Sequence, residues 1–102
     1  MDVFLSELAE SKLLKLNDYL IEKWGVKARD RFFQKLNQKI SQISSQPESC
    51  PQSTELKGLY KCAITKQSTF FYRILSKTNE IEIVTVFDTR QNPDSLKTDI
   101  KQ

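Results

Sequence analysis

The sequence predicts an α+β fold: a helical hairpin after a short edge strand, packed on a C-terminal antiparallel sheet of three to four strands. Two observations predict it. The first half places apolar side chains three and four residues apart, which is typical of helices that bury one face. The second half alternates β-branched and aromatic residues with polar ones, between short polar turns. Because helices precede strands, the two should form separate layers.

The first helix is expected over residues 6–24. Its apolar stripe consists of Ala9, Leu13, Leu16, Leu20 and Trp24, all expected in the core. Ser6 can cap the first turn, and the acids Glu7 and Glu10 suit the positive end of the helix dipole. Gly25 supplies the left-handed residue that commonly ends a helix.

A second helix is expected from about Val26 to Ser45, with Pro47 fixing its end. Its stripe consists of Ala28, Phe32, Leu36, Ile40 and Ile43. The connection between the helices is so short that they must form an antiparallel hairpin. The basic outer face of the hairpin carries Lys23, Lys27, Arg31, Lys35 and Lys39, and is expected to be solvated.

Three strands are expected next, over residues 59–65, 69–75 and 81–87. Short polar loops join them into two successive hairpins. The last of the three is the most apolar, which favours a central place in the sheet. Residues 1–5 are expected to add a short edge strand.

Length and composition limit the possible classes of protein. The 102 residues suit a single domain over 1–102, and a 38% hydrophobic content can build one core. There is no apolar run of about 20 residues, as a membrane span needs, and no secretory signal at the start. A cytoplasmic protein without membrane contact is expected. The net charge of +3 permits nucleic-acid or acidic-partner binding without requiring it.

Metal and cofactor chemistry find little support in the sequence. It contains no histidine, and the separation of Cys50 and Cys62 fits no zinc or redox spacing. We therefore expect no metal and no cofactor. The two cysteines are expected to be a loop thiol and a packed strand thiol.

Three cations stand out in the strand region. Arg73 lies inside the second strand, Lys61 on its neighbour, and Arg90 just beyond the third. In a simple register Lys61 and Arg73 point to the sheet face away from the helices, and Arg90 could close over it. Together they would hold an anion, either a phosphate or a partner's carboxylate.

Each cation also has an ordinary structural interpretation. Arg73 could pair with Glu80 or Glu82 on the next strand, and Arg90 with Asp88 or Asp94. Lys61 could simply be solvated. The neighbouring Tyr72 alternates with Arg73, so it is expected in the core with its hydroxyl satisfied at the edge.

Several short motifs occur in a characteristic order along nearly the whole chain. They are Leu8-Ala9-Glu10, Tyr19, Gly25 and Ala28 at the helical turn, Pro47, Gly58, Phe71-Tyr72-Arg73-Ile74, Ile81-Glu82-Ile83 and Asp88-Thr89-Arg90-Gln91-Asn92-Pro93. In this order and spacing the chain resembles the RelE/ParE superfamily of toxins from bacterial type II toxin–antitoxin systems.

The resemblance implies a compact growth-inhibiting toxin, neutralised in a hetero-oligomer by a cognate antitoxin protein. RelE-like members cleave mRNA, usually on the ribosome, whereas ParE-like members poison DNA gyrase. The long, tightly joined helices and the Gly25/Ala28 turn resemble the ParE branch more closely. Toxins that cut RNA with a terminal histidine differ from this chain, which has none.

Three functions therefore remain open from the sequence. The first is a ParE-like toxin that acts on DNA gyrase. The second is a ribosome-dependent endoribonuclease in which Lys61, Arg73 and Arg90 are the catalytic residues, although the family counterpart of Lys61 is often arginine. The third is a non-toxic relative that serves as a binding module. Whether the chain is an enzyme stays open.

Overall fold

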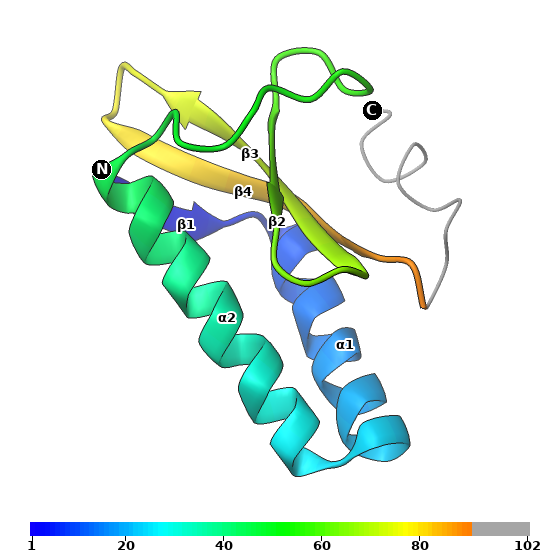
Figure 1. Ribbon diagram of the computed structural model, residues 1–102. Coiled ribbons are helices and arrows are strands. Elements are labelled where there is room, and N and C mark those ends of the chain that lie inside the picture. Colours follow the sequence, from blue (N-terminus) through cyan, green and yellow to red (C-terminus); the bar gives the residue numbers. More distant parts are fainter. Residues whose placement is uncertain (91–102) are drawn as a thin grey trace.

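The computed structural model describes residues 1–90, in which two helices cover one face of a four-stranded sheet (Figure 1). The elements in chain order are β1 (Asp2–Leu5), α1 (Glu7–Trp24), α2 (Val26–Ser45), β2 (Tyr60–Ala63), β3 (Ser68–Leu75) and β4 (Glu80–Asp88). The predicted α+β fold is confirmed. Within residues 1–90, neither helix combines the length and hydropathy needed to cross a bilayer.

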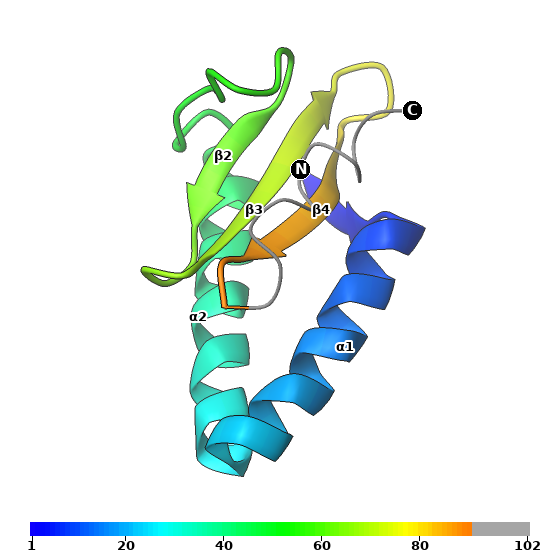
Figure 2. The ribbon, with the colours of Figure 1, turned by 90° about the vertical axis from the view of Figure 1, so that its right-hand side faces the viewer.

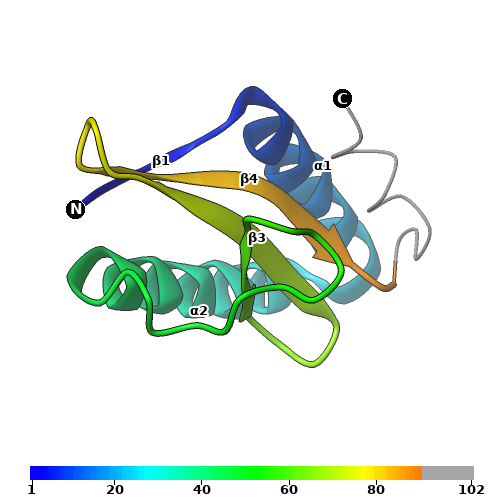
Figure 3. The same cartoon turned by 90° about the horizontal axis from the view of Figure 1, so that it is seen from above.

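The sheet has the strand order β1-β4-β3-β2, with β4 between β1 and β3 (Figure 3). The three later strands pair antiparallel as predicted, but β1 runs parallel to β4, so the sheet is mixed. The helical hairpin explains the direction, because it returns the chain beside its start. There the Met1 ammonium donates to the Ser44 carbonyl over 2.9 Å. β2 therefore begins at the same end of the sheet as β1. Because β3 is antiparallel to β2, and β4 is antiparallel to β3, β4 runs in the same direction as β1.

Ser6 joins the helix layer to the sheet. Its Oγ accepts from the Ala9 amide at 3.0 Å, which caps α1, and its own amide donates to the Ile83 carbonyl at 3.0 Å. The register between β3 and β4 shifts here: Phe71 faces Thr85 while Tyr72 faces Ile83. This β-bulge leaves Val84 without a partner in β3. Its carbonyl accepts from Ser6 Oγ at 2.6 Å.

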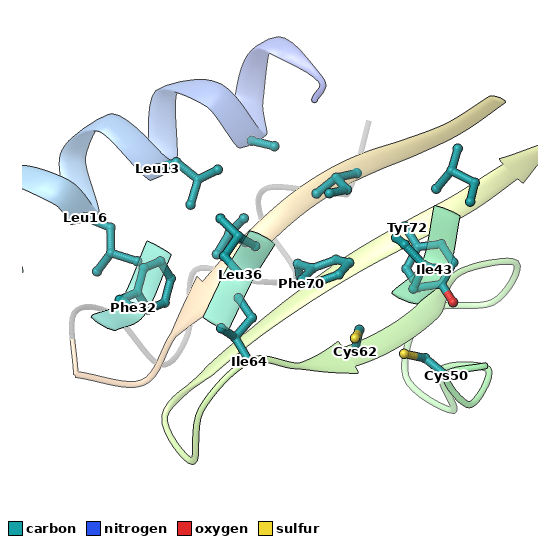
Figure 4. Close-up of a cluster of buried hydrophobic side chains, with 14 of the residues drawn as sticks. Leu13, Leu16, Phe32, Leu36, Ile43, Cys50, Cys62, Ile64, Phe70 and Tyr72 are labelled. Atoms are coloured by element: carbon teal, nitrogen blue, oxygen red, sulfur yellow. The ribbon is translucent and has the colours of Figure 1, made fainter. Parts of the chain in front are cut away.

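The main core lies between the hairpin and the sheet (Figure 4). Its buried members include Leu13, Leu16, Leu20, Phe32, Leu36, Ile43, Phe70, Tyr72, Ile81 and Ile83. Tyr72 is fully buried, as predicted, and its hydroxyl donates to the Pro47 carbonyl at 2.7 Å. Its ring stacks on Tyr60 at a centroid distance of 5.1 Å. The buried hydroxyl is thus satisfied by the loop that follows α2.

A second, smaller cluster lies on the face of the sheet away from the helices, called here the outer face. Leu59 and Phe71 are buried in it, with Leu56, Val84 and Phe87 packed around them. Leu56 belongs to the loop of residues 46–59, which therefore covers part of this face. Part of the outer face is therefore covered by the chain itself.

The two helices extend past the sheet, so the hairpin tip has no strand beneath it (Figures 1 and 2). Gly25 makes the turn with a φ of 92°, in the region that favours glycine. Trp24, which we expected in the core, is 62% exposed, and Ile21 and Val26 are also exposed. The prediction for Trp24 was wrong because the periodic stripe continues beyond the end of the sheet.

Replacing Ser6 by alanine should lower the free energy of unfolding by about 1–2 kcal/mol, because both the cap of α1 and the bond to the bulged carbonyl are lost. Urea unfolding measures the change. The control is Ser6→Thr, which keeps the hydroxyl and should remain near the wild type. An alanine variant as stable as the threonine variant would contradict this role of Ser6.

Candidate functional site

Two of the predicted site residues, Lys61 and Arg73, lie on the outer face. Lys61 is opposite Phe71 across β2 and β3, and Arg73 is opposite Glu82 across β3 and β4. Phe71 belongs to the outer cluster, and alternation along β3 places Arg73 on the same side. The simple register that we predicted between these two strands is therefore present.

Both of these cations are bound to carboxylates of the same chain. Lys61 Nζ lies 2.9 Å from Glu55 Oε1, and Arg73 Nε lies 2.6 Å from Glu82 Oε1. The predicted pairing of Arg73 with Glu82 is confirmed. The cationic side chains are about half exposed, so each pair contributes no more than about 1 kcal/mol to stability. An anionic ligand on this face would have to compete with these two carboxylates.

Arg90 is held at the end of β4 by Asp88, a buried carboxylate that accepts four hydrogen bonds. Ser68 Oγ donates at 2.6 Å, and Arg90 donates from its amide at 2.9 Å, Nε at 3.0 Å and Nη2 at 2.7 Å. Burial alone would raise the pKa of Asp88, but these hydrogen bonds outweigh it and hold the pKa below its usual value. The same bonds raise the pKa of Arg90.

Arg90 also lines a small cleft of about 170 Å³ at the end of the sheet, here called the basic cleft. Its lining comprises Leu20, Ala28, Arg31, Phe32, Lys35, Thr65, Gln67 and Arg90. Arg31 and Lys35 come from α2, and within residues 1–90 neither makes an ion pair. Three cations around one cleft, with a hydroxyl and an amide beside them, can attract a carboxylate or a phosphate.

The expectation that Lys61, Arg73 and Arg90 converge was wrong. Arg90 is anchored through Asp88 beside Ser68, where β3 begins, whereas Arg73 lies five residues further along that strand. At about 3.3 Å per residue, the backbone positions of Ser68 and Arg73 are roughly 17 Å apart. Arg90 also lines a cleft formed with the helices, while the other two cations lie on the outer face.

The cations that do accompany Arg90 are Arg31 and Lys35, which we expected only on a solvated helix face. Their four-residue spacing shows that they share one side of α2. Nothing in the sequence indicates that the end of β4 approaches that side. The site therefore depends on a tertiary contact that a periodic pattern does not encode.

The groups around these cations are poorly suited to proton transfer near neutral pH. Asp88 is ionised and fully hydrogen-bonded, and Arg90 keeps its proton. No group of three metal-ligating side chains gathers anywhere in the described part of the chain. The basic cleft can bind and orient an anion, but its own residues supply no general base.

A second concave site, here called the helical groove, lies between α1 and α2 beside Leu5 of β1. It has a volume of about 440 Å³. Its lining is mainly apolar and comprises Leu5, Leu13, Leu14 and Phe33, with Glu10, Asn17 and Arg29. Arg29 Nη1 donates to Asn17 Oδ1 at 3.0 Å, a contact between the two helices. Leu14 is 62% exposed in this groove, which gives it the character of a binding surface for an apolar segment.

Comparison with known proteins identifies the family. Residues 3–93 match the family described as the ParE toxin of type II toxin–antitoxin systems, parDE. The chain belongs to this family. It is accordingly a type II toxin of the RelE/ParE superfamily, as the sequence motifs predicted. A search of curated proteins gives no match.

Solved structures of toxins share the fold of this ParE-family chain at low sequence identity. The chromosomal ParDE system of Pseudomonas aeruginosa matches with a TM-score of 0.71 and 13% identity, over 86% of this chain and 95% of that one. A YoeB/ParE toxin from Agrobacterium tumefaciens gives 0.63 and 15%, over 86% and 98%. The intact Escherichia coli RelBE toxin–antitoxin complex gives 0.59 and 13%, over 85% and 94%.

Replacing Asp88 by asparagine should lower the free energy of unfolding of the ParE-family chain by about 2 kcal/mol at neutral pH, because a buried charged hydrogen bond is lost. The folded pKa of Asp88 is below its usual value of 3.8, so its stabilisation is full above that pH and declines as the pH falls below it. Acid unfolding should therefore be less steep in the variant.

The matched control is Asp30→Asn, which removes the carboxylate of the exposed pair between Arg29 and Asp30. This change should alter stability by less than about 0.5 kcal/mol. Chemical unfolding from pH 7 down to pH 3 measures both variants. If Asp88→Asn and Asp30→Asn gave the same pH profile, Asp88 would not be the anchor inferred from its hydrogen bonds.

Proposed function

We propose that this toxin inhibits growth in the cytoplasm by binding DNA gyrase, as expected of the ParE branch, and that it does not cleave RNA. The observation that carries the proposal is that each predicted catalytic cation is bound to a carboxylate of the chain itself: Lys61 to Glu55, Arg73 to Glu82 and Arg90 to Asp88. These pairs satisfy the cations without a phosphate.

The chemical requirements of RNA cleavage support the same proposal. Attack by the 2′-hydroxyl needs a base, an acid for the leaving oxygen and cations near one phosphate. The three predicted cations are divided between two faces, and Asp88, the buried carboxylate, is fully hydrogen-bonded. A toxin that acts by docking to a large target needs none of these groups.

The hairpin tip offers a surface for docking to gyrase. Trp24, Ile21 and Val26 expose apolar area where the helices project past the sheet. The exposed Lys23 and Lys27 flank this apolar group. The tip is complementary to an apolar notch with an acidic rim, and an exposed tryptophan is the side chain that most often anchors such an interface.

A cognate antitoxin is the second partner that we propose. Two of the similar structures are described as toxin–antitoxin systems, ParDE and RelBE. The helical groove, with its apolar lining of Leu13, Leu14 and Phe33, suits an amphipathic segment of such a protein. The groove lies between the helices and beside β1, away from the tip, and the toxin–antitoxin pair would form a hetero-oligomer.

The ribosome-dependent endoribonuclease remains the second candidate, because Lys61 and Arg73 do share the outer face. Purified toxin added to a gyrase supercoiling reaction should inhibit it, and mRNA in a translation reaction should remain intact. Arg73→Ala should keep its toxicity, since within residues 1–90 the ion pair of Arg73 is with Glu82. Cleaved mRNA with normal supercoiling, together with a non-toxic Arg73→Ala variant that still folds, would establish the endoribonuclease instead.

Replacing Trp24 by alanine should weaken inhibition of gyrase by at least about tenfold, because an exposed aromatic anchor is removed. The free energy of unfolding should change by less than about 0.5 kcal/mol, since Trp24 has little packing to lose. Supercoiling assays at graded toxin concentrations measure the loss.

Leu14→Ala is the matched control, because Leu14 lies on the same helix and is equally exposed. This variant should inhibit gyrase normally but bind the antitoxin about tenfold more weakly. Trp24→Ala should show the reverse pattern. Equal losses of gyrase inhibition in the two variants would rule out the hairpin tip as the docking surface.

A further inference from the structure

The loop of residues 46–59 runs back along the outer edge of β2 in an antiparallel arrangement. Gln52 and Tyr60 form an isolated bridge, and the Lys61 amide donates to the Pro51 carbonyl at 2.9 Å. The Ser53 amide donates to the Leu59 carbonyl at 2.7 Å. These contacts fix the register of the loop against the strand.

If this antiparallel register is continued from Gln52 and Tyr60 by two residues on each segment, Cys50 lies opposite Cys62. The hydrogen bonds flank the bridge between Gln52 and Tyr60, so Gln52 and Tyr60 are a non-hydrogen-bonded pair. In a regular ladder, Cys50 and Cys62 would be the next pair of this kind. Such pairs have Cα atoms about 4.5 Å apart, within the range of about 4.4–6.8 Å that a disulfide spans. Among the described residues, the backbone hydrogen bonds between this loop and β2 end at Pro51, and the direction of the loop brings Cys50 toward Cys62.

The side chains agree with the register. The Cys50 sulfur points from the loop toward Cys62 on β2, and the two thiols interact (Figure 4). Both cysteines are free thiols, and both are buried in the main core, with exposed fractions of 8% for Cys50 and 1% for Cys62. Burial, together with a hydrogen bond to Cys50, raises the pKa of the Cys62 thiol to about 12. Cys50, on the loop and slightly more exposed, is the thiol that an oxidant would reach first.

We propose that Cys50 and Cys62 form a redox-active dithiol that closes to an intramolecular disulfide and fastens the loop of residues 46–59 to the edge of β2. The oxidant is a small disulfide such as oxidised glutathione. This inference does not depend on the target of the toxin.

The reaction proceeds by two thiol–disulfide exchanges. The Cys50 thiolate attacks one sulfur of oxidised glutathione, forms a mixed disulfide and releases the first glutathione thiolate. Cys62 then loses its proton and attacks the Cys50 sulfur, which releases the second glutathione thiolate. The two cysteines are oxidised by two electrons, and the glutathione disulfide is reduced by two. The high pKa of Cys62 makes the second exchange the slower one, and it accelerates as the pH rises.

The disulfide would affect the outer edge of the sheet, at β2. β2 is the terminal strand, and residues 51–53 supply the backbone groups that cover its outer edge. While the thiols are reduced, the loop can open locally and free this edge to pair with an extended segment of another chain. The disulfide links the loop to β2 directly and suppresses that opening.

The test treats the folded full-length toxin with oxidised glutathione and then maps its peptides by mass spectrometry. We expect a link between the peptides of Cys50 and Cys62, reversed by dithiothreitol, with no retained glutathione. Hydrogen exchange of the amides of Ser53 and Lys61 should slow by about tenfold or more on oxidation. In Cys50→Ser, which keeps the loop but cannot form the bond, the same treatment should leave exchange unchanged.

Two results would overturn the proposal. One is glutathione retained on Cys50 without closure in the folded protein, while the urea-unfolded chain forms the link readily. The other is a disulfide that closes but leaves the exchange of Ser53 and Lys61 as fast as in the reduced protein. The first result would show that Cys50 and Cys62 do not act as a dithiol in the folded protein. The second would show that the disulfide does not hold the loop on β2.

Discussion

The fold depends on the pairing of β4 with a parallel strand on one side and an antiparallel strand on the other. The bulge at Val84 lies in this strand. Its free carbonyl accepts a hydrogen bond from the hydroxyl of Ser6, the residue that caps α1. The helix layer is thus hydrogen-bonded to the middle of the sheet as well as packed on it. At the far end of the same strand, Asp88 binds Ser68 and Arg90. The position of β4 in the sheet therefore determines both the hydrogen bond between the helix layer and the sheet and the location of the basic cleft.

The charges of the protein form two different arrangements. On the outer face, Lys61 pairs with Glu55 of the loop of residues 46–59 and Arg73 pairs with Glu82 of β4, so both cations are neutralised by the chain itself. In the basic cleft, Asp88 anchors Arg90, while Arg31 and Lys35 make no ion pair within residues 1–90. Excess positive charge is therefore concentrated beside the helices. This distribution supports the proposal that the toxin recognises an acidic partner and does not act on a phosphate.

Local patterns predicted much of the fold because they depend on neighbouring residues. Helical spacing, the cap at Ser6 and strand alternation correctly gave α1, α2, β3 and β4, as well as the buried Tyr72 and the pair between Arg73 and Glu82. The features that the sequence did not predict depend on where the helices, strands and loops end relative to one another. The direction of β1 and the exposure of Trp24 both follow from the length of the hairpin relative to the sheet. The burial of Cys50 and the separation of Arg90 from Arg73 follow from how a loop and a strand end lie on the fold, which no periodicity in the sequence encodes.

The central claim is that the toxin acts through the hairpin tip while its outer-face cations stay within the chain. The most direct measurement is hydrogen–deuterium exchange of the toxin, free and in complex with purified DNA gyrase. The account predicts slower exchange in peptides covering residues 20–31 and unchanged exchange around Lys61 and Arg73. Protection confined to the outer face, with the hairpin tip exchanging as in the free toxin, would contradict it.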